Sequence, residues 1–168
     1  MAKAILISIR PEWVKKILAG EKTLEVRKTR PKLETPFKCY IYCTNSGVAM
    51  GMWGKHGKVV GEFVCDKIDC VDIPYPAFMG KLDTHWTEDS GCTYYQLHRY
   101  FYHDMAYFWH ISNLKIYDNP KQLSEFKGLC RVEADCCACS YYNYTKMDCD
   151  CRTIKRSPRS WCYVEELK

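Results

Sequence analysis

The chain has 168 residues, of which 47% are hydrophobic, and its formal net charge is +5. This length predicts one domain with a sizeable core, and no apolar run is long enough to span a membrane. The first residues lead into an expected strand without a cleavage-site pattern, so the sequence predicts a cytoplasmic protein without a signal peptide. The mild positive charge is compatible with a nucleic-acid partner but does not establish one.

Short alternating apolar runs between turn signals predict several strands and a few short helices. The expected strands span residues 4–9, 23–28, 38–44, 58–73, 106–117 and 161–165, and the expected helical segments span residues 11–19, 93–103 and 120–126. Gly61 is expected to mark a bulge in the long fourth strand. Residues 45–56 are typical of a hairpin loop, and residues 74–91 of a loop with room for a short helix. Because strands and helices do not alternate, the pattern favours a small barrel over a doubly wound sheet.

The segment from Gly20 to Lys28 brings three charged side chains close together. Gly20 suits the end of the first helix, where a left-handed conformation is needed. The strand that follows has a period of two, which puts Glu25 and Arg27 on one face. Lys22 lies at the turn before this strand, so an ammonium, a carboxylate and a guanidinium converge within a few residues.

Two interpretations of this charged face stay open. A solvated ladder of ion pairs is the more common fate of such a strand and needs no ligand. Alternatively, the carbonyl or phosphate oxygens of a ligand in a cleft suit Lys22 and Arg27. Ser8 and Arg10, at the end of the first expected strand, lie where they can line the same cleft.

Residues 5–11 and 17–27 resemble the start of an ASCH domain, whose signature is a helix ending in Gly-x-Lys followed by a strand with Glu and Arg. Matching segments continue nearly to the end of the chain, at residues 40–42, 59–63, 108–112, 120–126 and 158–163. The resemblance is greatest to ASCH proteins of bacteria and prophages. It implies an α+β, mainly β fold: a PUA-like small β-barrel with peripheral helices and a cleft at one mouth. The length predicts a single domain over residues 1–168, and the cysteine pattern predicts a Cys-rich insertion within it.

The resemblance implies an RNA-binding or nucleotide-binding cleft. The lack of a long apolar run predicts no membrane partner, and the sequence does not indicate an oligomeric state. The expected ligand-binding residues are Ser8, Arg10, Lys22, Glu25 and Arg27. The alternative is an amidohydrolase, because some ASCH proteins remove the acetyl group from acetylcytidine. Its catalytic residues would be Lys22, Glu25 and Glu88, with Glu25 standing where those enzymes have a Thr.

The chain has 12 cysteines, and six of them fall between positions 130 and 151. In a reducing compartment, clustered cysteines indicate a metal and scattered ones indicate packing. The spacing predicts a structural zinc site in an insertion over residues 130–153, through Cys136, Cys139, Cys149 and Cys151, with Cys130 and Cys137 as alternates. The competing interpretations are a reduced, partly disordered insertion without metal and adventitious disulfides formed in air. The scattered cysteines assigned to packing are Cys39, Cys43, Cys65, Cys70, Cys92 and Cys162.

Overall fold

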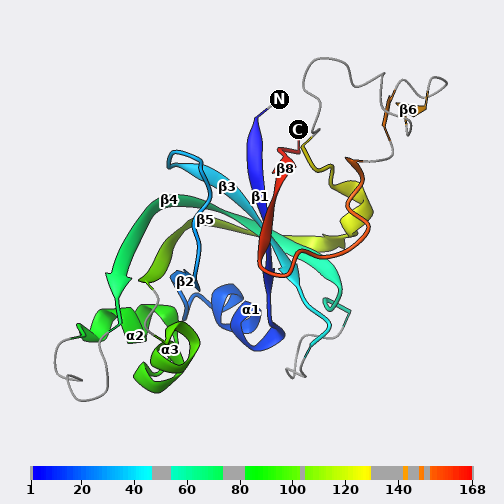
Figure 1. Ribbon diagram of the computed structural model, residues 1–168. Helices are drawn as coiled ribbons and strands as arrows, with labels where there is room; N and C mark the ends of the chain where they lie inside the picture. Colours follow the sequence, from blue (N-terminus) through cyan, green and yellow to red (C-terminus); the bar gives the residue numbers. More distant parts are fainter. Residues whose placement is uncertain are drawn as a thin grey trace.

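A six-stranded sheet with the strand order β2-β5-β4-β3-β1-β8 carries the fold (Figure 1). The computed structural model describes residues 2–46, 54–73, 82–102, 105–129, 142–143, 148–149 and 152–167. The strands are β1 (Lys3–Ile9), β2 (Leu24–Arg27), β3 (Phe37–Cys43), β4 (Lys58–Asp72), β5 (Met105–Lys121) and β8 (Trp161–Glu165). β1 and β3 are parallel and the other neighbouring strands are antiparallel, so the sheet is mixed.

The sheet does not close through backbone pairing, so the expected barrel is an open one. β2 and β8 are its two edge strands. Side chains link these edges instead: the Trp161 indole N–H donates to Thr29 Oγ1 at 3.1 Å, and the backbone N–H of Lys32 donates to the Tyr163 hydroxyl at 2.7 Å. Bulges in β4 help to curve the sheet, and one lies between Val59 and Gly61, as the sequence predicts.

Three helices of the described chain lie together at the lower end of the sheet in Figure 1. α1 (Pro11–Leu18) begins at a proline and buries Val14 and Ile17. α2 (Thr84–Ser90) lies in the region expected to have room for a short helix, and α3 (Tyr94–Phe101) starts with a capping box between Thr93 and Gln96. α1 and α3 therefore begin where the sequence supplies a start signal.

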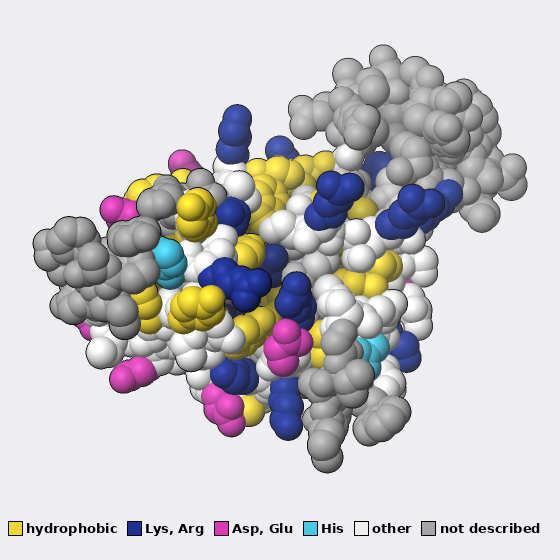
Figure 2. Space-filling model, turned by 60° about the horizontal axis from the view of Figure 1, so that its bottom comes forward, with side chains coloured by type: hydrophobic (Ala, Val, Ile, Leu, Met, Phe, Trp, Pro, Cys, Tyr) yellow, Lys and Arg dark blue, Asp and Glu magenta, His cyan; other side chains and the backbone are white. Residues whose placement is uncertain are grey.

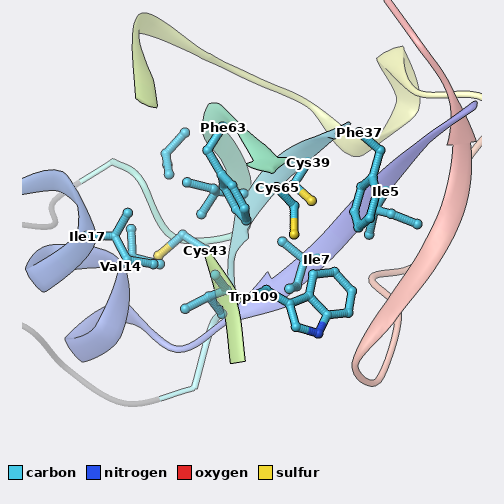
Figure 3. Packing of buried hydrophobic residues seen from close by; sticks show 13 residues of the cluster. Ile5, Ile7, Val14, Ile17, Phe37, Cys39, Cys43, Phe63, Cys65 and Trp109 are labelled. Carbon is cyan, nitrogen blue, oxygen red and sulfur yellow. The ribbon is translucent and has the colours of Figure 1, made fainter. Parts of the chain in front are cut away.

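The largest hydrophobic cluster, here called the inner cluster, fills the space between the sheet and α1 (Figure 3). Cys39 and Cys65 point into it beside Ile7 and Trp109. Burial raises the pKa of the Cys65 thiol to about 12 and that of Cys39 well above its usual value. Both thiols therefore stay protonated and act as small apolar side chains, as predicted.

The opposite faces of the strands pack into two further clusters. Tyr40 and Tyr42 alternate with the inner-facing residues of β3 and pack with Phe126 and Val164. The third cluster joins β2 and β5 to α3 and contains Leu24, Phe108, Leu97 and Phe101. These alternations confirm the expected period of two in β2 and β3.

One expectation about local structure holds in part and another is wrong. The helical turn expected over residues 120–126 forms only at Leu123–Glu125, as a 3-10 helix, because β5 continues through Pro120 to Lys121. Pro120 is tolerated because β2 pairs only with Tyr107 to His110 of β5, which leaves the later part of β5 without that neighbour. Cys70 is exposed rather than packed, because β4 runs past its last pairing with β3 at Cys65.

β4 and β5 approach closely at Gly61, so any side chain at this position is expected to clash with the backbone of β5. A Cβ atom there would lie 2.6 Å from the backbone oxygen of Lys115. Gly61→Ala should therefore lower the free energy of unfolding by about 1–3 kcal/mol in urea titration. Gly128→Ala is the control, since its Cβ would meet nothing closer than 3.4 Å. Equal, small effects of the two substitutions would contradict this strand packing.

Candidate functional site

Lys22 lies in the turn between α1 and β2 and is only 3% exposed. Gly20 adopts a positive φ of 75°, which turns the chain back after the helix. The Lys22 ammonium donates to the backbone oxygens of Leu24 at 2.6 Å and Ser90 at 2.8 Å, and it lies 3.4 Å from Glu25 Oε2. The ring of Trp13 lies 5.6 Å from the same ammonium. Lys22 thus ties the end of α2 to the start of β2.

Glu25 and Arg27 continue this group of charges along β2 and are 5% and 7% exposed. Arg27 Nη2 lies 2.9 Å from Glu25 Oε1 and donates to the backbone oxygen of Ser8 at 2.7 Å. Its Nη1 donates to Ser160 Oγ at 3.2 Å. Arg27 therefore reaches from one edge strand of the sheet to β1 and to the residue before β8, the other edge.

The alternation of β2 decides where these charges point. Leu24 packs into the third cluster, whereas Glu25 lies directly opposite Trp109 of β5 in the ladder. Residues directly opposite in a ladder project from the same face, so Glu25 and Arg27 share the inner face with Trp109. The interpretation of β2 as a solvated ladder does not describe this arrangement, because Lys22, Glu25 and Arg27 are buried.

Two buried N–H groups on this inner face have no acceptor among the described residues: Arg27 Nε and Trp109 Nε1. They belong to neighbouring strands, two positions apart in register. Buried donors are normally paired, because leaving one unpaired costs about 1–3 kcal/mol. This part of the interior therefore favours an oxygen acceptor.

The other expected site residues differ in their placement. Ser8 is 8% exposed and its hydroxyl donates to the backbone oxygen of Pro158 at 2.7 Å, beside Arg27. Arg10 is exposed immediately before α1. Glu88 is exposed on α2, which contacts Lys22 through the Ser90 carbonyl. The structure brings Ser8, Lys22, Glu25 and Arg27 together and leaves Arg10 and Glu88 on the surface.

Sequence reasoning missed the partners that hold these side chains. Ser90 contributes a backbone carbonyl, which any residue would supply, so its identity carries no signal. Trp13 covers Lys22 from α1, and Ser160 meets Arg27 across 133 positions of the chain.

Exposed cations flank the buried charges and their partners in the sequence, and we call this set the cationic rim. Lys and Arg side chains gather in the middle of the face that Figure 2 shows. The exposed cations nearest in sequence to the buried charges and their partners are Arg10, Lys15, Lys28, Arg30, Arg156 and Arg159. Lys16 lies 5.0 Å from the Trp13 ring, and Lys28 lies 5.5 Å from the Tyr100 ring. This rim combines cations with partly exposed aromatic rings.

A separate open hollow of about 560 Å³ is lined by residues that include Lys3, Lys38 and Glu166. Lys38 Nζ lies 2.8 Å from Glu166, and this hydrogen bond raises the pKa of Lys38. Glu62 lies 3.7 Å away on its other side. The Lys38 charge is therefore balanced within the protein, and the hollow gives less support for a charged ligand than the rim.

The predicted zinc site lies outside the described residues. Of Cys136, Cys139, Cys149 and Cys151, only the backbone of Cys149 is described, in β7 (Asp148–Cys149), which pairs with β6 (Tyr142–Asn143). The parts of the chain that are described contain no group of three or more His, Cys, Asp or Glu side chains able to hold a metal. They also contain no helix long and apolar enough to cross a membrane.

Comparison with solved structures identifies the fold. The crystal structure of ASCH from Zymomonas mobilis superposes with a TM-score of 0.62 at 17% identity, covering 97% of this chain and 88% of that one. A Ser-to-Ala mutant of that protein gives a TM-score of 0.62 at 18% identity over 97% and 89% of the two chains, and a Tyr-to-Phe mutant gives 0.55 at 20% over 73% and 77%. No protein-family model and no curated protein matches the sequence.

The buried position of Glu25 predicts a large stability loss when its charge is removed. Glu25→Gln would leave Lys22 and Arg27 buried without a carboxylate, which should cost about 3–5 kcal/mol in urea unfolding. Lys121→Gln is the matched control, because the Lys121–Glu125 pair is 3.6 Å apart and 36% and 46% exposed. Its loss should not exceed about 1 kcal/mol. Similar small losses for both variants would contradict the buried arrangement.

Proposed function

We propose that this chain, whose fold is that of an ASCH domain, binds single-stranded RNA or a nucleotide-like ligand. The binding site is the end of the sheet where Ser8, Lys22, Glu25 and Arg27 meet. The observation that carries the proposal is a buried, pre-ordered group of charges with cation–ring pairs, Lys16 with Trp13 and Lys28 with Tyr100, contributed by its neighbours in the sequence. Phosphates favour the cations, and bases favour the rings.

The buried and exposed residues have different roles in this proposal. Lys22, Glu25 and Arg27 hold the turn before β2 and the two edge strands in place through their hydrogen bonds. Arg10 and its exposed neighbours supply the phosphate contacts. Trp13 is partly exposed and offers a stacking surface next to Lys16. The unpaired Arg27 and Trp109 donors suit a carbonyl or phosphate oxygen of a ligand that reaches the interior.

Amide hydrolysis on a modified nucleoside such as acetylcytidine is the second candidate. The observation in its favour is the 3.4 Å separation of the Lys22 ammonium and Glu25, a pairing that could serve acid–base chemistry. Two observations make it the weaker candidate. The hydrogen bonds of the ammonium are taken up by protein oxygens, and Glu88 is exposed on α2.

RNA binding is tested with two charge-matched double variants. Arg10→Gln/Arg159→Gln removes two cations from the rim, whereas Lys3→Gln/Lys115→Gln removes two exposed cations elsewhere. The rim variant should bind a labelled single-stranded RNA more weakly in fluorescence anisotropy. Its plot of log affinity against log salt should be shallower by about 1.4, because about 0.7 is expected per lost phosphate contact. The control variant should bind like the parent.

Equal weakening by both double variants would mean that net charge alone drives binding, and no binding by the parent protein would reject the RNA proposal.

The hydrolase candidate is tested by incubating the same protein preparations with acetylcytidine and following the products by chromatography. Turnover that is lost in Glu25→Gln, in protein that circular dichroism shows to be folded, would favour the hydrolase instead.

We also propose that Cys136, Cys139, Cys149 and Cys151 bind one structural zinc ion. Four thiolates in two closely spaced pairs form a donor set that zinc commonly takes. Protein purified under reducing conditions should carry close to one equivalent of zinc by elemental analysis, and Cys139→Ser should lower that content. Cys70→Ser, which changes an exposed cysteine of β4, is the control and should not lower it. Metal-free parent protein would contradict the proposal.

A further inference from the structure

Two segments that are far apart in the sequence meet where the edge strands β2 and β8 face each other. Residues 27–32 leave the end of β2, and residues 156–163 approach β8 and form its first part. Three side-chain hydrogen bonds join the two segments, and they connect Arg27 to Ser160 at 3.2 Å, Thr29 to Trp161 at 3.1 Å and Lys32 to Tyr163 at 2.7 Å. We call the surface of these two segments the seam.

Both segments of the seam are held in place by the rest of the fold. Pro31 is buried. The Ser8 backbone N–H donates to the backbone oxygen of Ser160 at 2.9 Å, and the Ser8 hydroxyl donates to that of Pro158 at 2.7 Å. Side chains on an ordered backbone lose less conformational freedom when they bind a ligand.

The seam carries positive charge that the protein does not balance. Its exposed cations without an ion-pair partner among the described residues are Arg30, Lys32, Arg156 and Arg159. Residues 27–33 and 152–160 contain no Asp or Glu. Elsewhere the contrast is clear, since Lys38 lies 2.8 Å from Glu166. An unbalanced patch of one sign attracts ligands of the opposite charge, so the seam favours an anion.

The length of the seam indicates the kind of anion. Between Ser160 and Tyr163 an extended chain advances about 10 Å. A stacked nucleic-acid strand advances about 3.4 Å per nucleotide, so the same length covers about three nucleotides. Trp161 and Tyr163 are engaged in the hydrogen bonds that join the segments. We therefore assign the exposed cations, rather than these rings, to the ligand.

We propose that the seam binds successive phosphates of a single strand of RNA at least about three nucleotides long. This inference rests on the proposed function and deepens it, because it selects a strand over a single nucleotide as the ligand. Phosphate contacts position a strand without reading its bases. The seam should therefore bind RNA with little dependence on sequence.

The first test removes two cations of the seam. Arg30→Gln/Lys32→Gln should bind a labelled 12-nucleotide oligouridine more weakly than the parent in fluorescence anisotropy. Its plot of log affinity against log salt should be shallower by about 1.4, or about 0.7 per lost phosphate contact. Lys3→Gln/Lys115→Gln, the charge-matched control, should bind like the parent. Because all four side chains are exposed, neither variant should lose much stability in thermal unfolding.

The second test varies the ligand. The parent should bind the 12-nucleotide strand at least about tenfold more tightly than uridine monophosphate, because more phosphates are in contact. Arg30→Gln/Lys32→Gln should reduce this ratio, and it should weaken oligouridine and oligoadenosine by the same factor. Equal parent affinity for the monophosphate and the strand would overturn the seam but leave a nucleotide-like ligand in place. A loss confined to one base composition would show base reading and contradict phosphate tracking.

The third test asks whether the hydrogen bonds between the segments position the cations. Tyr163→Phe keeps the ring and removes the hydroxyl that accepts from Lys32. It should weaken RNA binding by about two- to tenfold, the range for one lost hydrogen bond, with an unchanged salt slope because no cation is lost. Parent-like affinity of this variant would overturn the positioning role of Tyr163.

The remaining outcomes separate this inference from the proposed function. Parent-like affinity of Arg30→Gln/Lys32→Gln, with Arg10→Gln/Arg159→Gln still impaired, would reject the seam and keep RNA binding by the domain. Absence of RNA binding by the parent would reject both. Binding of polyglutamate as tight as that of the 12-nucleotide strand would reject RNA as the partner of the seam.

Discussion

The carboxylate of Glu25 lies between two buried cations, and the end of the sheet depends on this arrangement. It is 3.4 Å from the Lys22 ammonium and 2.9 Å from the Arg27 guanidinium. Removing three charges from water is costly, and ion pairing seldom repays more than this cost. We therefore interpret the group as a positioning device. Lys22 fixes α2 against the start of β2 through the Ser90 carbonyl, and Arg27 links β2 to β1 and to Ser160.

This arrangement separates the residues that shape the site from those that can meet a ligand. The buried charges are already satisfied by protein oxygens, except at Arg27 Nε. Arg10 is exposed next to them in the sequence, whereas Trp13 is partly exposed and also covers Lys22. Substituting a buried charge would thus report mainly on folding, whereas substituting the rim reports on binding.

Local patterns predicted much of this fold, and contacts far apart in sequence account for what they missed. The period of two correctly predicted that Leu24 and Glu25 lie on opposite faces of β2, and a bulge lies at Gly61 as expected. The burial of Lys22 was not predictable, because a charged turn is usually solvated and its partner is a backbone carbonyl 68 positions away. The extension of β5 through Pro120 was not predictable from local sequence for a similar reason. A proline is tolerated there because β2 pairs only with Tyr107 to His110 of β5, a contact between segments far apart in the chain.

The most direct test of the account is an NMR titration of the isotopically labelled full chain with single-stranded RNA. If the rim binds RNA, the indole N–H signal of Trp13 and the backbone signals of Arg10, Lys28 and Ser160 should shift progressively to saturation. Signals of residues around the hollow at Lys38 should stay in place. Shifts confined to that hollow, with the Trp13 and Arg10 signals unmoved, would contradict the central claim.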